Sequence, residues 1–296
     1  MSDKRSHQSR SRSALGLLWR TLVVGLGYTV AVMIGGMITQ ALGVPMPSMA
    51  ADVDQSQMLV LLSLSGLLFG LTMGPLSARL TVPGLQRAVL LFVVLFILNS
   101  LINVIEALFF TTAPPAELLA GLLTSAVGHA GLALLLAALF QPASVKGGLV
   151  SALRETLAQR RWVSWIGRFA LAGVLYVPIY LFFGAIISPI VLPYYQQLEM
   201  GLTVPGFDVI LPLELFRGLL YALTLFLLIA ALRGSRRSTA FWVVLTLCVL
   251  GSWQPMLQAA WWPIPLRVTH GLEITVDSIV QGLAITLLLW TPTEDV

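Results

Sequence analysis

Long apolar runs dominate the chain, and short segments rich in proline, glycine or basic residues separate them. A helix needs about 20 apolar residues to cross the hydrocarbon core of a bilayer. Eight runs are long enough, and we number them span one to span eight: residues 15–42, 58–79, 88–110, 117–140, 163–191, 209–232, 239–261 and 272–290. The pattern therefore predicts an all-α polytopic membrane protein with eight transmembrane helices.

Composition excludes the main alternative, a water-soluble domain. Hydrophobic residues make up 57% of the 296 residues and charged residues only 10%, whereas soluble domains carry about 25% charged residues. The single cysteine, Cys248, lies inside span seven, which excludes an internal disulfide and a C-x-x-C metal or redox motif. Nucleotide-binding motifs are absent too, and we expect no cofactor, no bound metal and no nucleic-acid partner.

Basic residues occupy every second connection between the spans. The N-terminal segment and the connections after spans two, four and six contain Lys or Arg, whereas the remaining connections contain only Arg267. Because Lys and Arg are retained on the cytoplasmic side, this alternation predicts that both termini are cytoplasmic. We expect a multi-pass protein of the cell (inner or plasma) membrane, with a disordered basic tail over residues 1–14 and a short cytoplasmic tail over residues 292–296.

The connection after span four, residues 142–162, is longer than the others and has an amphipathic pattern. Leu149, Val150, Leu153 and Leu157 fall on one face of a helix, and the basic residues fall off that face. This arrangement predicts an amphipathic helix on the cytoplasmic leaflet, which would also offer a docking surface for a protein partner. The alternative is an ordinary solvated linker helix.

The second part of the chain repeats features of the first. Five residues recur 148 positions later: Arg20, Gly25, Tyr28, Gly36 and Pro45 as Arg168, Gly173, Tyr176, Gly184 and Pro193. The run GLLFGLT at 66–72 recurs 152 positions later as GLLYALT at 218–224. We therefore predict two parallel four-helix repeats, a first half (residues 15–141) and a second half (residues 163–291). They have the same orientation because each contains an even number of spans.

Ionisable residues inside the spans are the best candidates for a functional site, because charge is costly in hydrocarbon and is retained there mainly for function. With the orientation above, these residues fall in the outer third to half of the membrane, with Asp277 slightly deeper. The candidate substrate-binding residues are Glu106, Glu214, Arg217, His270, Glu273 and Asp277. Asn99, Gln254 and Gln281, taken singly, are more typical of hydrogen bonds that hold helices together.

One charged pair distinguishes the two halves. Glu214 and Arg217 lie one turn apart, so their side chains are able to pair. At the offset of 152 positions, their counterparts in the first half are Leu62 and Ser65. A single site between unequal halves explains this asymmetry better than a scaffold duplicated for packing alone.

Three functions fit these residues. The leading hypothesis is a transporter-like protein whose outward-facing charged cavity binds a solute or a lipid headgroup. Glu214, Glu273 and Asp277 would be proton or cation sites, and Arg217 would be a counter-ion or an anion contact. The first alternative is an intramembrane enzyme at the outer leaflet, in which Glu273 orients His270 as a general base. The second alternative is a non-catalytic subunit or scaffold, in which the charges are buried ion pairs.

Overall fold

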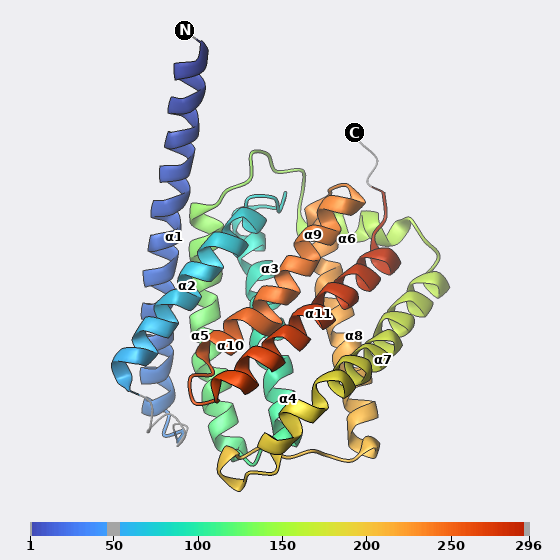
Figure 1. Cartoon of the computed structure of the whole chain (residues 1–296). Helices are drawn as coiled ribbons and strands as arrows, with labels where there is room; N and C mark the ends of the chain where they lie inside the picture. Colours follow the sequence, from blue (N-terminus) through green and yellow to red (C-terminus); the bar gives the residue numbers. More distant parts are fainter. Residues whose placement is uncertain (1, 46–53, 293–296) are drawn as a thin grey trace.

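The computed structural model describes residues 2–45 and 54–292, and helices account for 83% of it. The elements are α1 (Ser2–Ala41), α2 (Gln55–Ser77), α3 (Gly84–Phe96), η2 (Ile97–Leu101), α4 (Ile102–Phe110), α5 (Pro115–Leu139), α6 (Leu149–Ala158), α7 (Trp162–Tyr195), η3 (Leu198–Met200), α8 (Phe207–Leu232), α9 (Arg236–Leu247), η4 (Cys248–Trp253), α10 (Gln254–Gln258) and α11 (Ile264–Leu289). Eight helical stretches are long and apolar enough to cross a membrane (Figure 1). The predicted multi-pass, all-α membrane fold is confirmed.

Span eight begins earlier than the apolar pattern predicts. Helix α11 starts at Ile264 rather than at 272, with Pro263 as its N-cap residue and a proline in its first turn. Proline is favoured there because its fixed φ suits a helix and its missing N–H would have no partner in the helix. Arg267, counted above in a connection, and His270 therefore belong to the first two turns of this helix.

The N-terminal tail also differs from the prediction. The sequence predicts disorder over residues 1–14, but α1 begins at Ser2 and continues into the first apolar span (Figure 1). Extending an existing helix requires no new nucleation, so an apolar span can propagate helix into a polar flank. Residue 1, residues 46–53 of the loop after α1, and residues 293–296 of the predicted C-terminal tail lie outside the described residues.

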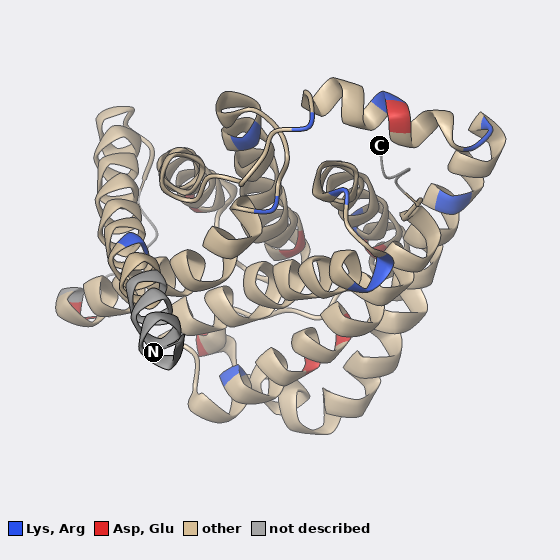
Figure 2. Cartoon of the chain, turned by 90° about the horizontal axis from the view of Figure 1, so that it is seen from above, with Lys and Arg blue, Asp and Glu red and all other residues tan. Residues whose placement is uncertain are grey.

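The connections gather at two opposite ends of the bundle, as the alternating loop charges predict. At the end that carries both termini, the Lys146 N–H donates to the Thr81 carbonyl at 2.9 Å, and Lys and Arg are scattered over this face (Figure 2). At the opposite end, the Thr112 N–H donates to Gly201 and the Thr203 N–H to Phe110, both at 2.9 Å. Which end faces the cytoplasm remains a prediction.

The linker helix α6 lies at the end with the termini and packs its apolar residues against the interior of the protein. Leu149, Leu153 and Leu157 pack against the hydrophobic core, and the Leu157 carbonyl accepts a hydrogen bond from the Trp165 indole at 2.9 Å. Val150, predicted on the same face, is 60% exposed. Most of the apolar face therefore packs against the bundle, and a partner would meet mainly the polar side of α6.

Two close helix contacts occupy matching positions in the two halves. A Cβ atom added at Gly66 of α2 would lie 2.6 Å from the Gly25 carbonyl oxygen of α1. A Cβ added at Gly218 of α8 would lie 2.6 Å from the Gly173 carbonyl oxygen of α7. Only glycine permits so close an approach of two helix backbones, which is the usual role of small residues in membrane bundles.

Aromatic pairs lie next to these glycine contacts in both halves. The Tyr28 and Phe69 ring centroids are 5.2 Å apart, with an interplanar angle of 85°. The Tyr176 and Tyr221 centroids are also 5.2 Å apart, with an angle of 65°. Both are edge-to-face arrangements, which place the positive edge of one ring against the negative face of the other.

Two π-helical turns interrupt spans three and seven. They are η2 and η4, and the Asn99 side chain of η2 donates to the Leu250 carbonyl of η4 at 2.7 Å. A π-helical turn leaves backbone carbonyls free to accept hydrogen bonds from neighbouring helices, and such turns are frequent at functional sites. These two turns bring the halves into direct polar contact in the middle of the bundle.

Candidate functional site

A three-residue ion cluster joins the halves inside the bundle. Arg217 of α8 is 4% exposed, and its Nη1 donates to both carboxylate oxygens of Glu214 at 2.8 Å. Its Nη2 donates to Glu106 of α4 at 2.6 Å. Glu214 is fully buried, whereas the Glu106 side chain is 26% exposed. Glu106 comes from the first half and Arg217 from the second, so this ion pair crosses between them.

The balance of charge in this cluster favours a further positive species. Two carboxylates face one guanidinium, which leaves one excess negative charge when both are ionised. An uncompensated charge is expensive in a low-dielectric interior. A proton or a cation at one carboxylate would remove this excess, and Glu106, the more exposed of the two, is the one that such a species reaches more easily.

One face of α7 connects this cluster with a second one on α11. Tyr176 and Tyr180 lie one turn apart and place their rings 5.8 and 6.0 Å from the Arg217 guanidinium carbon, within cation–π distance. One further turn along, a Cβ added at Gly184 would lie 3.5 Å from a Glu273 carboxylate oxygen. The face of α7 thus covers Arg217 with aromatic rings and leaves room for Glu273.

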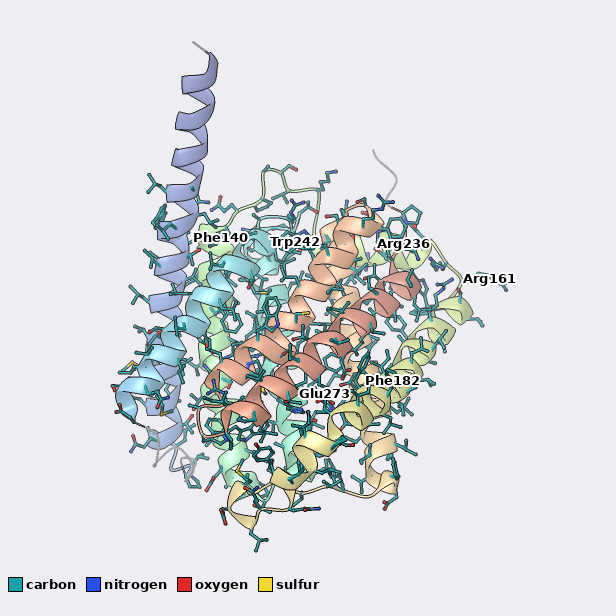
Figure 3. All side chains as sticks on the ribbon, viewed as in Figure 1. Phe140, Arg161, Phe182, Arg236, Trp242 and Glu273 are labelled. Atoms are coloured by element: carbon teal, nitrogen blue, oxygen red, sulfur yellow. The ribbon has the colours of Figure 1, made fainter. Side chains whose placement is uncertain are left out.

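The second cluster is an imidazole–carboxylate pair. His270 Nδ1 lies 2.6 Å from Glu273 Oε2, one turn apart on α11. The Glu273 side chain is 5% exposed and that of His270 is 21% exposed, and the Trp262 ring lies 5.7 Å from the imidazole. Figure 3 shows Glu273 deep in the bundle, where α11 passes α7. The carboxylate therefore orients the imidazole, which is the part of the pair nearer to solvent.

Two buried polar groups continue the line of charged residues along α11. Asp277 and Gln281 are 6% and 3% exposed. Asp277 Oδ1 and Gln281 Nε2 have no hydrogen-bond partner among the described residues. Buried polar groups are normally hydrogen-bonded, so an unpaired carboxylate oxygen and an unpaired amide nitrogen one turn apart call for a functional explanation.

A separate uncharged network surrounds His129. Its Nε2 lies 3.1 Å from Asn99 Oδ1, its Nδ1 lies 3.4 Å from the Ser100 hydroxyl, and its ring stacks on Tyr28 at 6.3 Å. The Asn99 amide also donates to Gln254 at 2.7 Å. Asn99 and Gln254 hold helices together, as the sequence suggests. Asn99 therefore belongs to this network, while Glu106, predicted on the same helical face, turns to α8.

Two hollows in the described part of the protein lie outside the Arg217 and His270 clusters. A groove of about 470 Å³ runs between α10 and α11 and is lined by Trp253, Met256 and Leu272 among others. A smaller hollow of about 240 Å³ opens at the end of the bundle that carries the termini. Ion pairs and tyrosine rings surround Arg217, and the outward-facing cavity stays a prediction.

The structure brings five of the six predicted site residues into two clusters on facing helices. Glu106, Glu214 and Arg217 form the first, and His270 and Glu273 the second. The sixth, Asp277, lies one turn beyond Glu273 on α11.

Tyr176, Tyr180 and Gly184 are not among the predicted site residues, although the structure places them beside the two clusters. Their spacing of four residues on α7 was the signal, since it puts all three on one helical face. With this geometry established, the chain was compared with protein-family models, curated proteins and solved structures, and none of them matches it.

Proposed function

We propose that this protein is a proton-coupled transporter of the cell membrane, with both termini cytoplasmic. It would carry a small anionic solute or an anionic lipid headgroup. The observation that carries the proposal is the buried Arg217, which a carboxylate from each half neutralises. An ion pair across two halves of a bundle is a contact that substrate binding and release can exchange.

The matched contacts of the two halves support this proposal. The Gly25–Gly66 and Gly173–Gly218 approaches agree with the predicted repeat, and so do the two π-helical turns η2 and η4. We infer that the halves are parallel repeats related by an axis along the membrane normal. Transporters built from repeats place their substrate site near the repeat interface and expose it alternately to the two sides.

The proposed binding step exchanges one anion for another on Arg217. A proton from the outer side neutralises Glu106, which is the more exposed carboxylate, and Glu106 then releases the guanidinium. The carboxylate or phosphate of the substrate replaces it, because a guanidinium offers two parallel N–H donors to either group. Glu214 stays bound throughout, so the charge near Arg217 is conserved while the substrate and the proton enter together.

The polar line on α11 supplies further proton or cation sites in this proposal. His270 and Glu273 lie nearer the outer end, and Asp277 and Gln281 follow at successive turns toward the other end. From His270 to Gln281 the helix rises by about 16 Å, roughly half of the hydrocarbon thickness. The unpaired Asp277 Oδ1 is suited to accept a proton, and the unpaired Gln281 Nε2 is suited to donate a hydrogen bond to a bound water or anion.

Proton movement into proteoliposomes tests the proposal. In one assay, acetate, lactate, inorganic phosphate or glycerol phosphate is added outside vesicles that contain a pH-sensitive dye. In a second assay, dithionite quenching follows the flipping of fluorescent phosphatidylglycerol between the leaflets. We expect one of these anions to acidify the lumen or the lipid to flip. Glu106→Gln should abolish the proton movement, and Glu199→Gln, an exposed acid outside both clusters, should not. Wild-type vesicles that behave like empty vesicles, or Glu106→Gln vesicles that move protons as fast as the wild type, would refute the proposal.

The His270–Glu273 pair supports a second candidate, a hydrolase that acts at the outer leaflet. A carboxylate at 2.6 Å fixes the imidazole so that its other nitrogen is able to activate a water molecule. Mass spectrometry of phospholipid vesicles incubated with the protein would reveal released headgroups or lysolipids. Release that His270→Gln abolishes would favour the hydrolase, and intact lipids after long incubation would exclude it for these lipids.

A further inference from the structure

The hollow of about 240 Å³ at the end with the termini is lined by both halves of the chain. The first half contributes Arg79 and Thr81, the linker contributes residues 142–144, and the second half contributes the turn between α8 and α9. The Thr81 N–H donates to the Ala231 carbonyl at 3.3 Å, so the two sides are joined at its base. The hollow therefore lies on the seam between the halves.

Two arginines line this hollow, and no acidic residue does. The Arg79 guanidinium carbon lies 5.3 Å from the Trp242 ring, which Figure 3 shows near this end of the bundle. Stacking fixes the plane of a guanidinium and leaves its N–H edge free for an anion. Arg233 pairs with Glu155 at 2.7 Å, but the Glu155 side chain is 59% exposed, and such a surface pair is weak.

The start of a helix lies at the same hollow. Helix α9 begins here, with Ser235 as its N-cap and with Ser238 and Thr239 lining the hollow. Ser235 accepts hydrogen bonds from the N–H groups of both lining residues, so α9 contributes through its dipole, whose N-terminal end favours a negative charge nearby. Arg233 caps α8 with a positive φ of 43°, which is uncommon for a residue with a side chain. This turn thus places the start of α9 and the Arg233 side chain at one opening.

We propose that this hollow binds the phosphate of an anionic phospholipid, with Arg79 and Arg233 as its cationic contacts. The hollow lies where α2 ends at Ser77 and α8 at Leu232, which is the level of lipid headgroups around a bundle of this length. Phe241, on the next turn of α9, is 58% exposed and offers a surface to an acyl chain. Basic pockets between membrane helices are suited to such headgroups. A lipid bound here bridges the two halves, and this inference does not depend on the transport proposal.

Thermal unfolding of the delipidated full-length protein in detergent tests the site. Dioleoyl phosphatidylglycerol should raise Tm by at least about 3 °C, since a ligand that binds only the folded state stabilises it. Dioleoyl phosphatidylcholine, which has no net charge, should give a much smaller shift. Native mass spectrometry should show one phosphatidylglycerol retained per chain at low lipid excess.

The variant Arg79→Gln/Arg233→Gln should lose both the Tm shift and the retained lipid. Arg161→Gln, at the same end but outside the hollow, is the matched control and should keep them. If the double variant unfolds, Ser238→Asp provides a second test. Position 238 is the third residue of α9, where a carboxylate suits the helix, so this variant should fold and fill the site with its own negative charge.

Each outcome decides the proposal. Loss of the phosphatidylglycerol shift in either variant, with the shift kept in Arg161→Gln, supports it. An equal shift with inorganic phosphate alone would show that the site takes a free anion, and the lipid proposal would then be wrong. A phosphatidylglycerol shift that survives in both the double variant and Ser238→Asp would overturn the site itself.

Discussion

Helices α2 and α8, which the predicted repeat pairs, make the same kind of contact but differ in chemistry. Each approaches the preceding helix through a glycine, Gly66 on Gly25 and Gly218 on Gly173. Directly before that glycine, α8 carries Arg217 in an ion cluster. In α2 the buried Ser65 hydroxyl donates to its own helix at 2.9 Å. Both helices thus make the glycine contact, whereas only α8 carries the charged pair.

The neighbours of these helices show the same division. In the first half, Tyr28 stacks on the uncharged His129 network, while in the second half Tyr176 covers Arg217. Glu106 is the exception, since it comes from the first half and binds the second. The glycine and aromatic contacts therefore build the bundle in both halves, whereas the charged residues around Arg217 serve a site. The following predictions test this difference.

The largest effect is expected from Arg217→Met. It leaves Glu214 buried without its partner, which costs about 3–5 kcal/mol for a buried pair. Thermal unfolding in detergent should show a large fall in Tm. The double variant Glu214→Leu/Arg217→Ser copies the α2 side chains and should recover most of the stability without recovering transport. A double variant as unstable as Arg217→Met would show that the pair is structural.

The glycine contacts should respond alike in the two halves. Gly66→Ala and Gly218→Ala each place a Cβ 2.6 Å from a carbonyl oxygen of the facing helix. The helices must move apart, at a cost of about 1–3 kcal/mol. We expect similar falls in Tm for both variants, and Gly16→Ala, which meets nothing within 4 Å, is the control. A large effect in one half only would contradict the equivalence of α2 and α8.

The sequence predicts the common features of the halves much better than the site. The eight spans follow from the length of the apolar runs. Gly25 and Gly66, which are in close contact, belong to the residues that recur in the second half. The six charged candidates were found because charge is rare in hydrocarbon.

Other features depend on three-dimensional packing. The role of Tyr180 was missed because an aromatic residue in a span is ordinary until its neighbour is known to be an arginine. Asn99 and Glu106 are seven residues apart and would share a face of a regular helix, but η2 interrupts the helix at Asn99. The membership of the Arg217 cluster also depends on packing, since it requires Glu106 to reach across from another span.

The His129 network should affect stability without affecting transport. Asn99→Ala removes hydrogen bonds to Leu250, Gln254 and His129. Polar contacts between membrane helices contribute about 1–2 kcal/mol or less, so we expect a moderate fall in Tm. Proton movement in proteoliposomes should remain near the wild-type rate once the amount of folded protein is matched. Complete loss of transport would instead extend the site to this network.

The smallest effect on stability is expected at Gly36 and Gly184, which the predicted repeat pairs. These two positions also test whether only the second half serves the site. A Cβ at Gly36 meets nothing within 4 Å, and one at Gly184 meets only Glu273, at an ordinary contact distance of 3.5 Å. Alanine at either position should leave Tm unchanged or raise it slightly, because alanine favours helix by about 0.5–1 kcal/mol over glycine. Only Gly184→Ala crowds a site carboxylate, so it alone should alter the rate or the pH dependence of transport. Equal transport in the two variants would place Glu273 outside the path of the substrate and of the proton.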